Sequence, residues 1–171
     1  MTLASLLRDV PDFPTPGIIY KDITPLLADP VGFAMTVDGL ADLYVGRGID
    51  RVVGVEARGF IIGAPVAYRL GAGFTPVRKA GKLPWSVEAE EYALEYGTDR
   101  LEVHVDAVVP GERVLIIDDV LATGGTAAAT VRLLERVGAE VVGLGFILEL
   151  TFLHGRERLT GYEVDTLLVV E

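Results

Sequence analysis

The 171-residue sequence contains no cysteine, which excludes disulfide bonds, thiolate metal sites and a cysteine nucleophile. Positive charge is scarce: 15 basic residues against 25 acidic ones give a net charge of −10, which argues against a broad nucleic-acid-binding surface. The longest uncharged run, residues 120–131, is too short to span a bilayer, and the N-terminus lacks the pattern of a secretory signal. We therefore expect a soluble, cytoplasmic protein that binds neither nucleic acid nor membrane.

Side-chain amides are also absent, because the chain has neither Asn nor Gln, and only three lysines accompany its twelve arginines. This composition fits a thermophilic protein, and it also fits a GC-rich genome that favours Arg over Lys. The three lysines are Lys21, Lys79 and Lys82, and all of them fall in segments with other signs of ligand binding. A compact ammonium group suits contact with a polyphosphate.

Apolar residues are plentiful, at 50% of the chain, so the sequence can form a substantial core. Apolar runs typical of buried strands occupy residues 51–55, 74–77, 113–117, 140–148 and 166–170. Apolar residues at helical spacing occupy residues 30–44, 60–70 and 125–137. Strands separated by helices predict an α/β fold with a central parallel sheet that helices cover on both faces.

Two segments depart from this pattern. Residues 11–17 contain three prolines and cannot form regular structure, and they separate a predicted short helix at 3–10 from a β-branched run at 18–20. Residues 78–111 are first polar, charged and aromatic, and then alternate like an antiparallel strand at 101–106. We interpret them as a long hairpin-like excursion, and such excursions in compact domains are usually functional or disordered.

The most informative segment is Val114–Thr126, VLIIDDVLATGGT. An apolar strand leads into the carboxylates Asp118 and Asp119, and a loop of small and hydroxyl residues then opens a helix. Ligands of parallel sheets bind at the carboxyl ends of strands, and a glycine-rich turn into a helix offers N–H groups that suit a phosphate. The carboxylates repel phosphate, so they suit sugar hydroxyls, or a metal ion that the phosphates also hold.

This segment resembles the phosphoribosyl-pyrophosphate signature of the type I phosphoribosyltransferases. Four other segments resemble the adenine branch of that family, in its order and spacing: FPTPGIIYKDITPLL (13–27), GVEARGF (54–60), RKAGKLP (78–84) and LEYGTDRLEVHVDAV (94–108). The resemblance spans nearly the whole chain. It implies a single domain, residues 1–171, in which a central parallel sheet is flanked by helices. It adds a small N-terminal hood for base recognition (1–28) and a flexible antiparallel lid (78–111).

The family resemblance also implies an activity. Members transfer the 5-phosphoribosyl group of phosphoribosyl pyrophosphate to N9 of adenine, which gives AMP and pyrophosphate in purine salvage, and they use Mg²⁺ and form homodimers. The sequence leaves two alternatives open. One is the same chemistry on xanthine, hypoxanthine or a pyrimidine, and the other is a non-catalytic regulator that senses phosphoribosyl pyrophosphate. The net charge of −10 weighs against a regulator that binds nucleic acid.

The family's ligand contacts carry over residue by residue. The 5-phosphate and ribose are assigned to Asp118, Asp119, Ala122, Thr123, Gly124, Gly125 and Thr126. The diphosphate is assigned to Glu56, Ala57, Arg58, Gly59, Arg78, Lys79 and Lys82. Of these, the cations between 78 and 82 come from the same subunit or from the partner subunit. Adenine is assigned to Ile19, Tyr20 and Lys21. The resemblance also implies a cis peptide bond after Glu56, and a Mg²⁺ ion that the substrate mainly holds, with Asp118 or Asp119 as a candidate contact through water.

Two residues are assigned to catalysis, Arg58 beside the pyrophosphate and Glu95 over the bound base. A carboxylate at the latter position can share a proton with the imidazole ring of adenine. Glu95 also belongs to an acidic run that is equally typical of solvated surface. Tyr20 and Lys21 stand where relatives often have Phe and Arg. Recognition of the base through backbone groups tolerates both changes, whereas Lys cannot reproduce the planar fork of a guanidinium.

Overall fold

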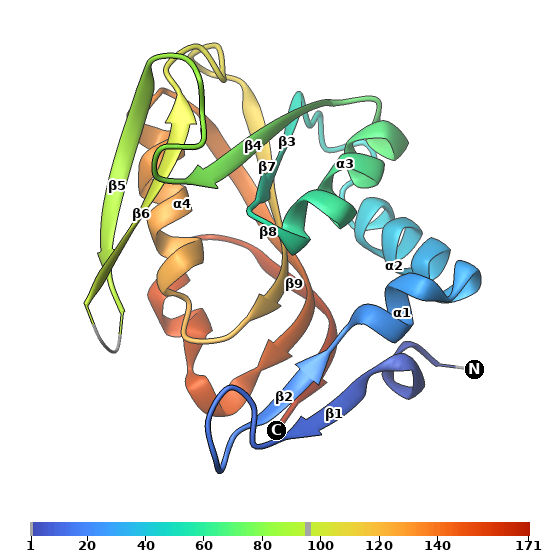
Figure 1. The fold of residues 1–171 in the computed structure, drawn as a ribbon. Helices are drawn as coiled ribbons and strands as arrows, with labels where there is room; N and C mark the ends of the chain where they lie inside the picture. Colours follow the sequence, from blue (N-terminus) through green and yellow to red (C-terminus); the bar gives the residue numbers. More distant parts are fainter. Residues whose placement is uncertain (1, 95–96) are drawn as a thin grey trace.

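The computed structural model describes residues 2–94 and 97–171. In this part of the chain the main sheet has the spatial order β5 (Val87–Ala93), β6 (Thr98–His104), β4 (Gly73–Lys79), β3 (Arg51–Val55), β7 (Arg113–Leu121), β8 (Glu140–Leu150) and β9 (Val164–Val170) (Figure 1). A second, two-stranded sheet contains β1 (Arg8–Pro11) and β2 (Ile19–Asp22). The helices are α1 (Thr24–Ala28), α2 (Pro30–Asp42), α3 (Arg58–Leu70) and α4 (Gly125–Arg136), and the short 3₁₀ helices are η1 (Leu3–Leu6), η2 (Thr151–Leu153) and η3 (Gly155–Leu159).

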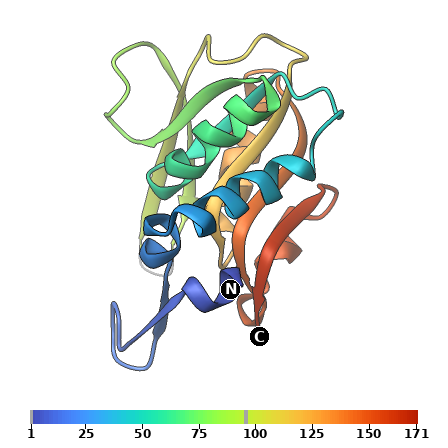
Figure 2. The ribbon, with the colours of Figure 1, turned by 90° about the vertical axis from the view of Figure 1, so that its right-hand side faces the viewer.

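The centre of the main sheet is parallel, as the sequence predicts. Strands β4, β3, β7, β8 and β9 pair in parallel from neighbour to neighbour, whereas β6 pairs antiparallel with both β4 and β5. Helices α2 and α3 lie side by side on one face of the sheet (Figure 2), and α4 covers the other face. None of the helices in the described residues is both long enough and apolar enough to cross a membrane.

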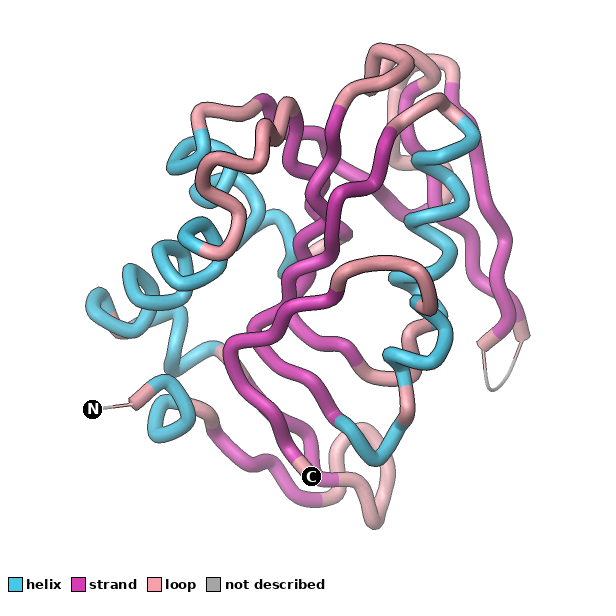
Figure 3. The backbone as a smooth tube through the Cα atoms, turned by 180° about the vertical axis from the view of Figure 1, so that it is seen from behind, coloured by secondary structure: helices cyan, strands magenta, loops and turns pink. Residues whose placement is uncertain are grey.

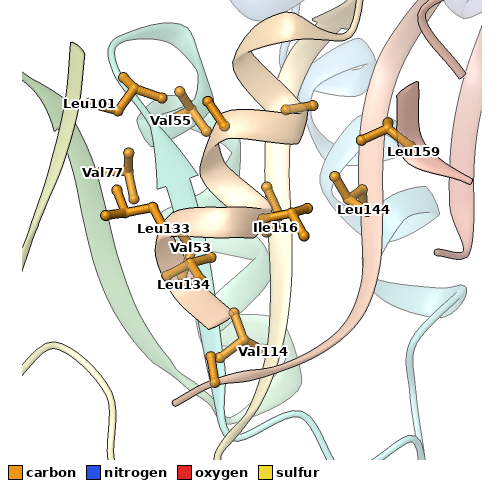
Figure 4. Close-up of a cluster of buried hydrophobic side chains, with 14 of the residues drawn as sticks. Val53, Val55, Val77, Leu101, Val114, Ile116, Leu133, Leu134, Leu144 and Leu159 are labelled. Atoms are coloured by element: carbon orange, nitrogen blue, oxygen red, sulfur yellow. The ribbon is translucent and has the colours of Figure 1, made fainter. Parts of the chain in front are cut away.

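The hydrophobic core has two layers, one on each face of the sheet. On the α4 face, Val53, Val55 and Ile116 point toward the helix (Figure 4). On the opposite face, Val52 and Leu115 pack with α2 and α3. Successive residues of a strand point to opposite faces, so each central strand needs an unbroken apolar run to supply both layers.

Local sequence signals set the helix boundaries. The Asp29 carboxylate accepts hydrogen bonds from the N–H groups of Val31 and Gly32, and Pro30 occupies the first helical position, so α2 begins where the sequence predicts. This helix ends at Asp42, two residues before the predicted end, and turns follow. The predicted helix at residues 3–10 is wrong in its second half, because those residues form β1 and pair with β2.

The excursion expected at residues 78–111 extends the sheet at one edge. Its two strands, β5 and β6, form a hairpin that lies outside α4 (Figure 3). The hairpin joins the rest of the sheet through a short antiparallel pairing, in which Arg78 lies opposite Glu102 and Lys79 opposite Leu101. The hairpin thus reaches from the end of β4 to the first turn of α4, where the sequence places the phosphate site.

Candidate functional site

The loop between β7 and α4 forms a cradle of backbone N–H groups, here called the phosphate loop (residues 122–126). Gly124 has a φ of +79°, a left-handed conformation that glycine adopts without steric cost. The helix that starts at Gly125 has no side-chain cap, so its first N–H groups are free of such a partner. These groups and the positive end of the helix dipole together favour a phosphate ligand.

Gly155, at the start of η3, packs directly behind the phosphate loop. A Cβ atom on Gly155 would lie 2.2 Å from the carbonyl oxygen of Ala122, and one on Gly124 would lie 2.3 Å from the carbonyl oxygen of Gly155. No side chain fits between these two backbone segments, so η3 fixes the shape of the loop. Gly155 was not predicted from the sequence, because nothing in its neighbourhood distinguishes it from an ordinary turn glycine.

Asp118 and Asp119 lie near the end of β7, beside the phosphate loop. Asp119 is only 5% exposed, and Arg58 contacts its carboxylate. Burial and the neighbouring charge of Asp119 raise the pKa of Asp118 well above its usual value. The strand continues to Leu121, beyond the carboxylates that the sequence suggested as its end. Oxygen atoms of both side chains can accept hydrogen bonds, and the raised pKa of Asp118 favours a protonated form that can also donate one, so both side chains suit the hydroxyl groups of a sugar.

The segment between β3 and α3 brings a cation to these carboxylates. It contains a cis peptide bond between Glu56 and Ala57, as the resemblance implies. Gly59 allows the start of α3 to approach β7, because a Cβ atom there would lie 2.9 Å from a carboxylate oxygen of Asp118. This approach places the Arg58 guanidinium at the cavity.

The remaining cations assigned to the diphosphate are held by carboxylates. Lys82 and Arg78 contact Glu56, which also accepts a hydrogen bond of 2.9 Å from the backbone N–H of Lys79. Burial by itself would raise the pKa of Glu56, but the hydrogen bonds from Lys82 and Lys79 and the charge of Arg78 lower it below its usual value. The Lys79 ammonium contacts Asp99 on β6.

The N-terminal hairpin of β1 and β2 covers one end of the site. Ile18, Ile19, Tyr20 and Lys21 line the cavity there. The Lys21 ammonium contacts the Asp9 carboxylate at 2.6 Å, so its charge is paired within the hairpin. Ile19 is 57% exposed, and an exposed aliphatic group next to a tyrosine ring offers a surface on which a planar base can lie.

These segments enclose a cavity of about 370 Å³, a size typical of small-molecule sites. The predicted residues that line it are Ile19, Tyr20, Lys21, Glu56, Ala57, Arg58, Lys79, Asp118, Asp119, Ala122, Thr123, Gly124, Gly125 and Thr126. Gly59, Arg78 and Lys82 are not part of the lining: Gly59 packs against β7, and the two cations contact Glu56. Glu95 lies outside the described residues.

The apolar wall of the cavity was not predicted from the sequence either. Phe146 and Leu150 of β8 line it, together with Val120 and Leu121 of β7. Only the pairing of β7 with β8 brings these residues together. The signal that could have found them is the preference of consecutive parallel strands, here joined through α4, to lie side by side in the sheet.

The comparisons with known proteins agree with this geometry. A family model described as "Phosphoribosyl transferase domain" matches residues 33–166. The adenine phosphoribosyltransferase of Acidothermus cellulolyticus is 58% identical over 168 residues, which are 98% of this chain and 95% of that protein.

Solved structures give the same result. The crystal structure of adenine phosphoribosyltransferase from Thermoanaerobacter pseudethanolicus has a TM-score of 0.95 at 51% identity, with 98% of each chain covered. The Saccharomyces cerevisiae enzyme, complexed with D-2,5-dideoxy-2,5-imino-altritol 1,6-bisphosphate and adenine, has a TM-score of 0.91 at 40% identity, with 96% of each chain covered. The chain therefore belongs to the phosphoribosyltransferase family and, within it, to the adenine phosphoribosyltransferases.

Proposed function

We propose that this protein transfers the 5-phosphoribosyl group of phosphoribosyl pyrophosphate to N9 of adenine, which gives AMP and pyrophosphate and salvages the purine. The observation that carries the proposal is a single cavity that joins the phosphate loop, two carboxylates, the Arg58 guanidinium and the N-terminal hairpin. The complex of the yeast relative with adenine and a bisphosphate supports this choice of base and sugar phosphate.

The sugar phosphate binds along β7 and α4 in this proposal. The N–H groups and hydroxyls of the phosphate loop hold the 5-phosphate, because they meet the positive end of the α4 dipole. The carboxylates of Asp118 and Asp119 accept hydrogen bonds from the ribose 2- and 3-hydroxyls. Both ends of the ribose are then fixed, so C1 faces the hairpin that binds the base.

The diphosphate binds away from the phosphate loop, beside the positively charged side chains. Arg58 and Lys79 line the cavity, whereas Arg78 and Lys82 exchange Glu56 for phosphate oxygens, either in the same subunit or across a dimer. As the bond from C1 to the leaving oxygen breaks, these cations stabilise the negative charge that develops on pyrophosphate.

The donor atoms fit a magnesium ion that the substrate mainly holds. Asp118 and Asp119 supply carboxylate oxygens, the ligand type that Mg²⁺ prefers. Across the described ranges, no group of three or more His, Cys, Asp or Glu side chains could hold a metal ion unaided. Bound Mg²⁺ would neutralise part of the diphosphate charge.

The base enters through the N-terminal hairpin, where backbone groups near Ile19, Tyr20 and Lys21 recognise its edge. Its N9 attacks C1 of the ribose, and the carboxylate of Glu95 takes up the proton that leaves the imidazole ring. The assignment of Glu95 is based on the resemblance of its segment to the family. Residues 78–111 act as a lid that excludes water from C1, where water would hydrolyse the substrate. We further propose that the enzyme acts as a cytoplasmic homodimer.

A panel of bases tests this proposal. The purified protein is incubated with phosphoribosyl pyrophosphate, Mg²⁺ and adenine, hypoxanthine, xanthine or uracil, and each nucleotide product is identified by mass. We expect AMP to form at least about 100-fold faster than the other nucleotides, because backbone groups that pair with the edge of adenine are left unpaired by a base with a different edge. Faster turnover of another base would show that the enzyme is specific for that base. Binding of phosphoribosyl pyrophosphate without turnover of any base would favour the regulator instead.

A further inference from the structure

Asp99 occupies a position on β6 where the alternation of the strand favours an apolar residue. Leu101 and Val103 share its phase, and both are fully buried in the cluster that includes α4. Its register partner on β5 is Tyr92, which is 7% exposed and belongs to the same cluster. The Asp99 side chain is partly buried, at 26% exposure, and even a partly buried carboxylate is costly unless hydrogen bonds and opposite charge compensate it, so its partners are informative.

These partners form a chain of contacts between two residues that line the ligand cavity, Thr126 and Lys79. The Tyr92 hydroxyl donates a hydrogen bond to Asp99 at 3.2 Å and accepts one from the Thr126 hydroxyl, also at 3.2 Å. The Asp99 carboxylate also contacts the Lys79 ammonium. Thr126 and Lys79 line the cavity, whereas Tyr92 and Asp99 are not part of its lining. The β5–β6 hairpin therefore connects the phosphate loop to Lys79, one of the cations assigned to the diphosphate.

The contact with the Asp99 carboxylate leaves the Lys79 ammonium able to bind a ligand. Burial by itself would lower the pKa of Lys79, but the hydrogen bond from its ammonium to Asp99 raises it above its usual value. An ammonium group has three donors, so contact with Asp99 leaves donors for phosphate oxygens. The Asp99 carboxylate also accepts a hydrogen bond from the N–H of Arg100 at 2.8 Å, which spreads its charge over several donors.

We propose that Tyr92 and Asp99 are positioning residues that hold Lys79 and Thr126 at a fixed separation, so that the diphosphate and the 5-phosphate of one substrate molecule are bound together. This proposal depends on the proposed function, because it assumes phosphoribosyl pyrophosphate as the ligand. It adds a role for the hairpin, which becomes the part of the molecule that sets the distance between the two phosphate sites.

Two conservative variants test the link. Asp99→Asn removes the charge at nearly constant shape, and Tyr92→Phe removes only the hydroxyl. We expect each variant to raise the KM for phosphoribosyl pyrophosphate about tenfold while kcat stays within about twofold, because the linked residues bind ground state and transition state alike. Two matched controls remove similar groups outside the cavity lining. Tyr162→Phe removes a hydroxyl that donates a 2.6 Å hydrogen bond to Glu135, and Asp38→Asn removes a charge that is paired with Arg69. Both controls should keep the wild-type KM.

A double-mutant cycle separates positioning from support of the fold. If Asp99 acts through Lys79, Asp99→Asn should have no further effect on KM in a Lys79→Ala background. A full effect of Asp99→Asn in that background would overturn the proposal, because the carboxylate would then act independently of the lysine. A lower KM in Asp99→Asn alone would overturn it as well, since Asp99 would then compete with the diphosphate.

Calorimetry with ligand fragments completes the test. In Tyr92→Phe, the affinity for phosphoribosyl pyrophosphate should fall about tenfold, whereas those for ribose 5-phosphate and for pyrophosphate should change by less than about twofold, because each site stays intact and only their relative placement is lost. Equal losses for all three ligands would contradict the proposal. These binding measurements do not need turnover, so they remain decisive even if wild-type protein fails to convert adenine, a result that would refute only the proposed function.

Discussion

At the scale of single residues, the cations assigned to the ligand lie against carboxylates of the same chain. Arg58 contacts Asp119, and Lys82 contacts Glu56, both of which are largely buried. These contacts compensate carboxylates that would otherwise be costly to bury. In the proposed function, a phosphorylated ligand replaces carboxylate oxygens at cations such as Lys82, whereas Lys79 keeps its contact with Asp99. The affinity of the site is therefore set by pairs of residues rather than by the cations alone.

The double variant Asp118→Asn plus Asp119→Asn tests the assignment of the ribose. We expect it to bind phosphoribosyl pyrophosphate at least about tenfold more weakly, because neutral amides are poorer acceptors for the sugar hydroxyls than carboxylates. Isothermal titration calorimetry measures this affinity. Pyrophosphate has no sugar hydroxyls, so its affinity should not fall, and the exposed Asp106→Asn serves as a control. Unchanged affinity for phosphoribosyl pyrophosphate would show that these carboxylates do not bind the ribose.

At the scale of secondary-structure elements, ion pairs attach the β5–β6 hairpin to α4. Glu90 on β5 contacts both Arg132 and Arg136, and Arg136 also contacts Glu88. These arginines lie on one side of α4, four residues apart, so that they face the same strand. The body of the hairpin is therefore held in place, and lid motion is expected in the turn that precedes β5.

The attachment of the hairpin should weaken in acid. The hydrogen bond from Arg132 is the main cause of the lowered pKa of Glu90, and Arg136 adds to it. A carboxylate whose pKa is lower in the folded state stabilises that state above its unfolded pKa, near 4.5, and loses this effect as the pH falls through the folded value. The protection factors of β5 amides, which compare their hydrogen exchange with the intrinsic rate at each pH, should therefore fall below about pH 4.5, with a loss of about 1 kcal/mol.

The matched variants for this prediction lie next to each other on β5. Glu90→Gln should show the lower protection factors already at neutral pH and lose most of their acid dependence, whereas the exposed Glu91→Gln should behave like the wild type. If Glu90→Gln exchanged at the wild-type rate across the pH range, the ion pairs with α4 would not hold the hairpin.

The elements also show what could be read from the sequence. Strand β3 and helix α4 were predicted nearly to the residue, because an apolar run and a glycine-flanked helical stripe are local signals. The phosphate loop was predictable for the same reason. The contact of Lys82 with Glu56, and the chain from Thr126 to Lys79, join segments far apart in the sequence, and no local pattern encodes them. Gly155 was missed because its role depends on a backbone that approaches it from another strand.

At the scale of the whole molecule, apolar side chains remain exposed outside the cavity. Helix α3 carries Ile61 at 46% and Tyr68 at 88% exposure, and the adjoining α2 carries Val31 and Met35, which are also exposed. Exposed apolar groups on neighbouring elements are typical of surfaces that contact another protein. They are therefore the surface that we assign to the proposed homodimer.

Sedimentation tests this assembly. We expect a mass about twice the 18.3 kDa of one chain, and Tyr68→Glu should shift the equilibrium toward the monomer, because the new charge would have to be buried without a partner. Tyr162→Phe, on the other side of the chain's core, serves as a control. A wild-type protein that sediments as a monomer at micromolar concentration would contradict the dimer. If Tyr68→Glu remained dimeric, the dimer interface would lie elsewhere than on α3.

The contact of Gly155 with the phosphate loop has a consequence for biosynthesis. Every residue assigned to the ligand precedes residue 127, yet the backbone that shapes the loop comes from η3, almost thirty residues later. A truncated polypeptide that stops between these points would carry every residue assigned to the ligand and still lack the support of the loop. A nascent chain thus acquires its affinity only after η3 has emerged from the ribosome, and from then on the ligand stabilises completed molecules over fragments.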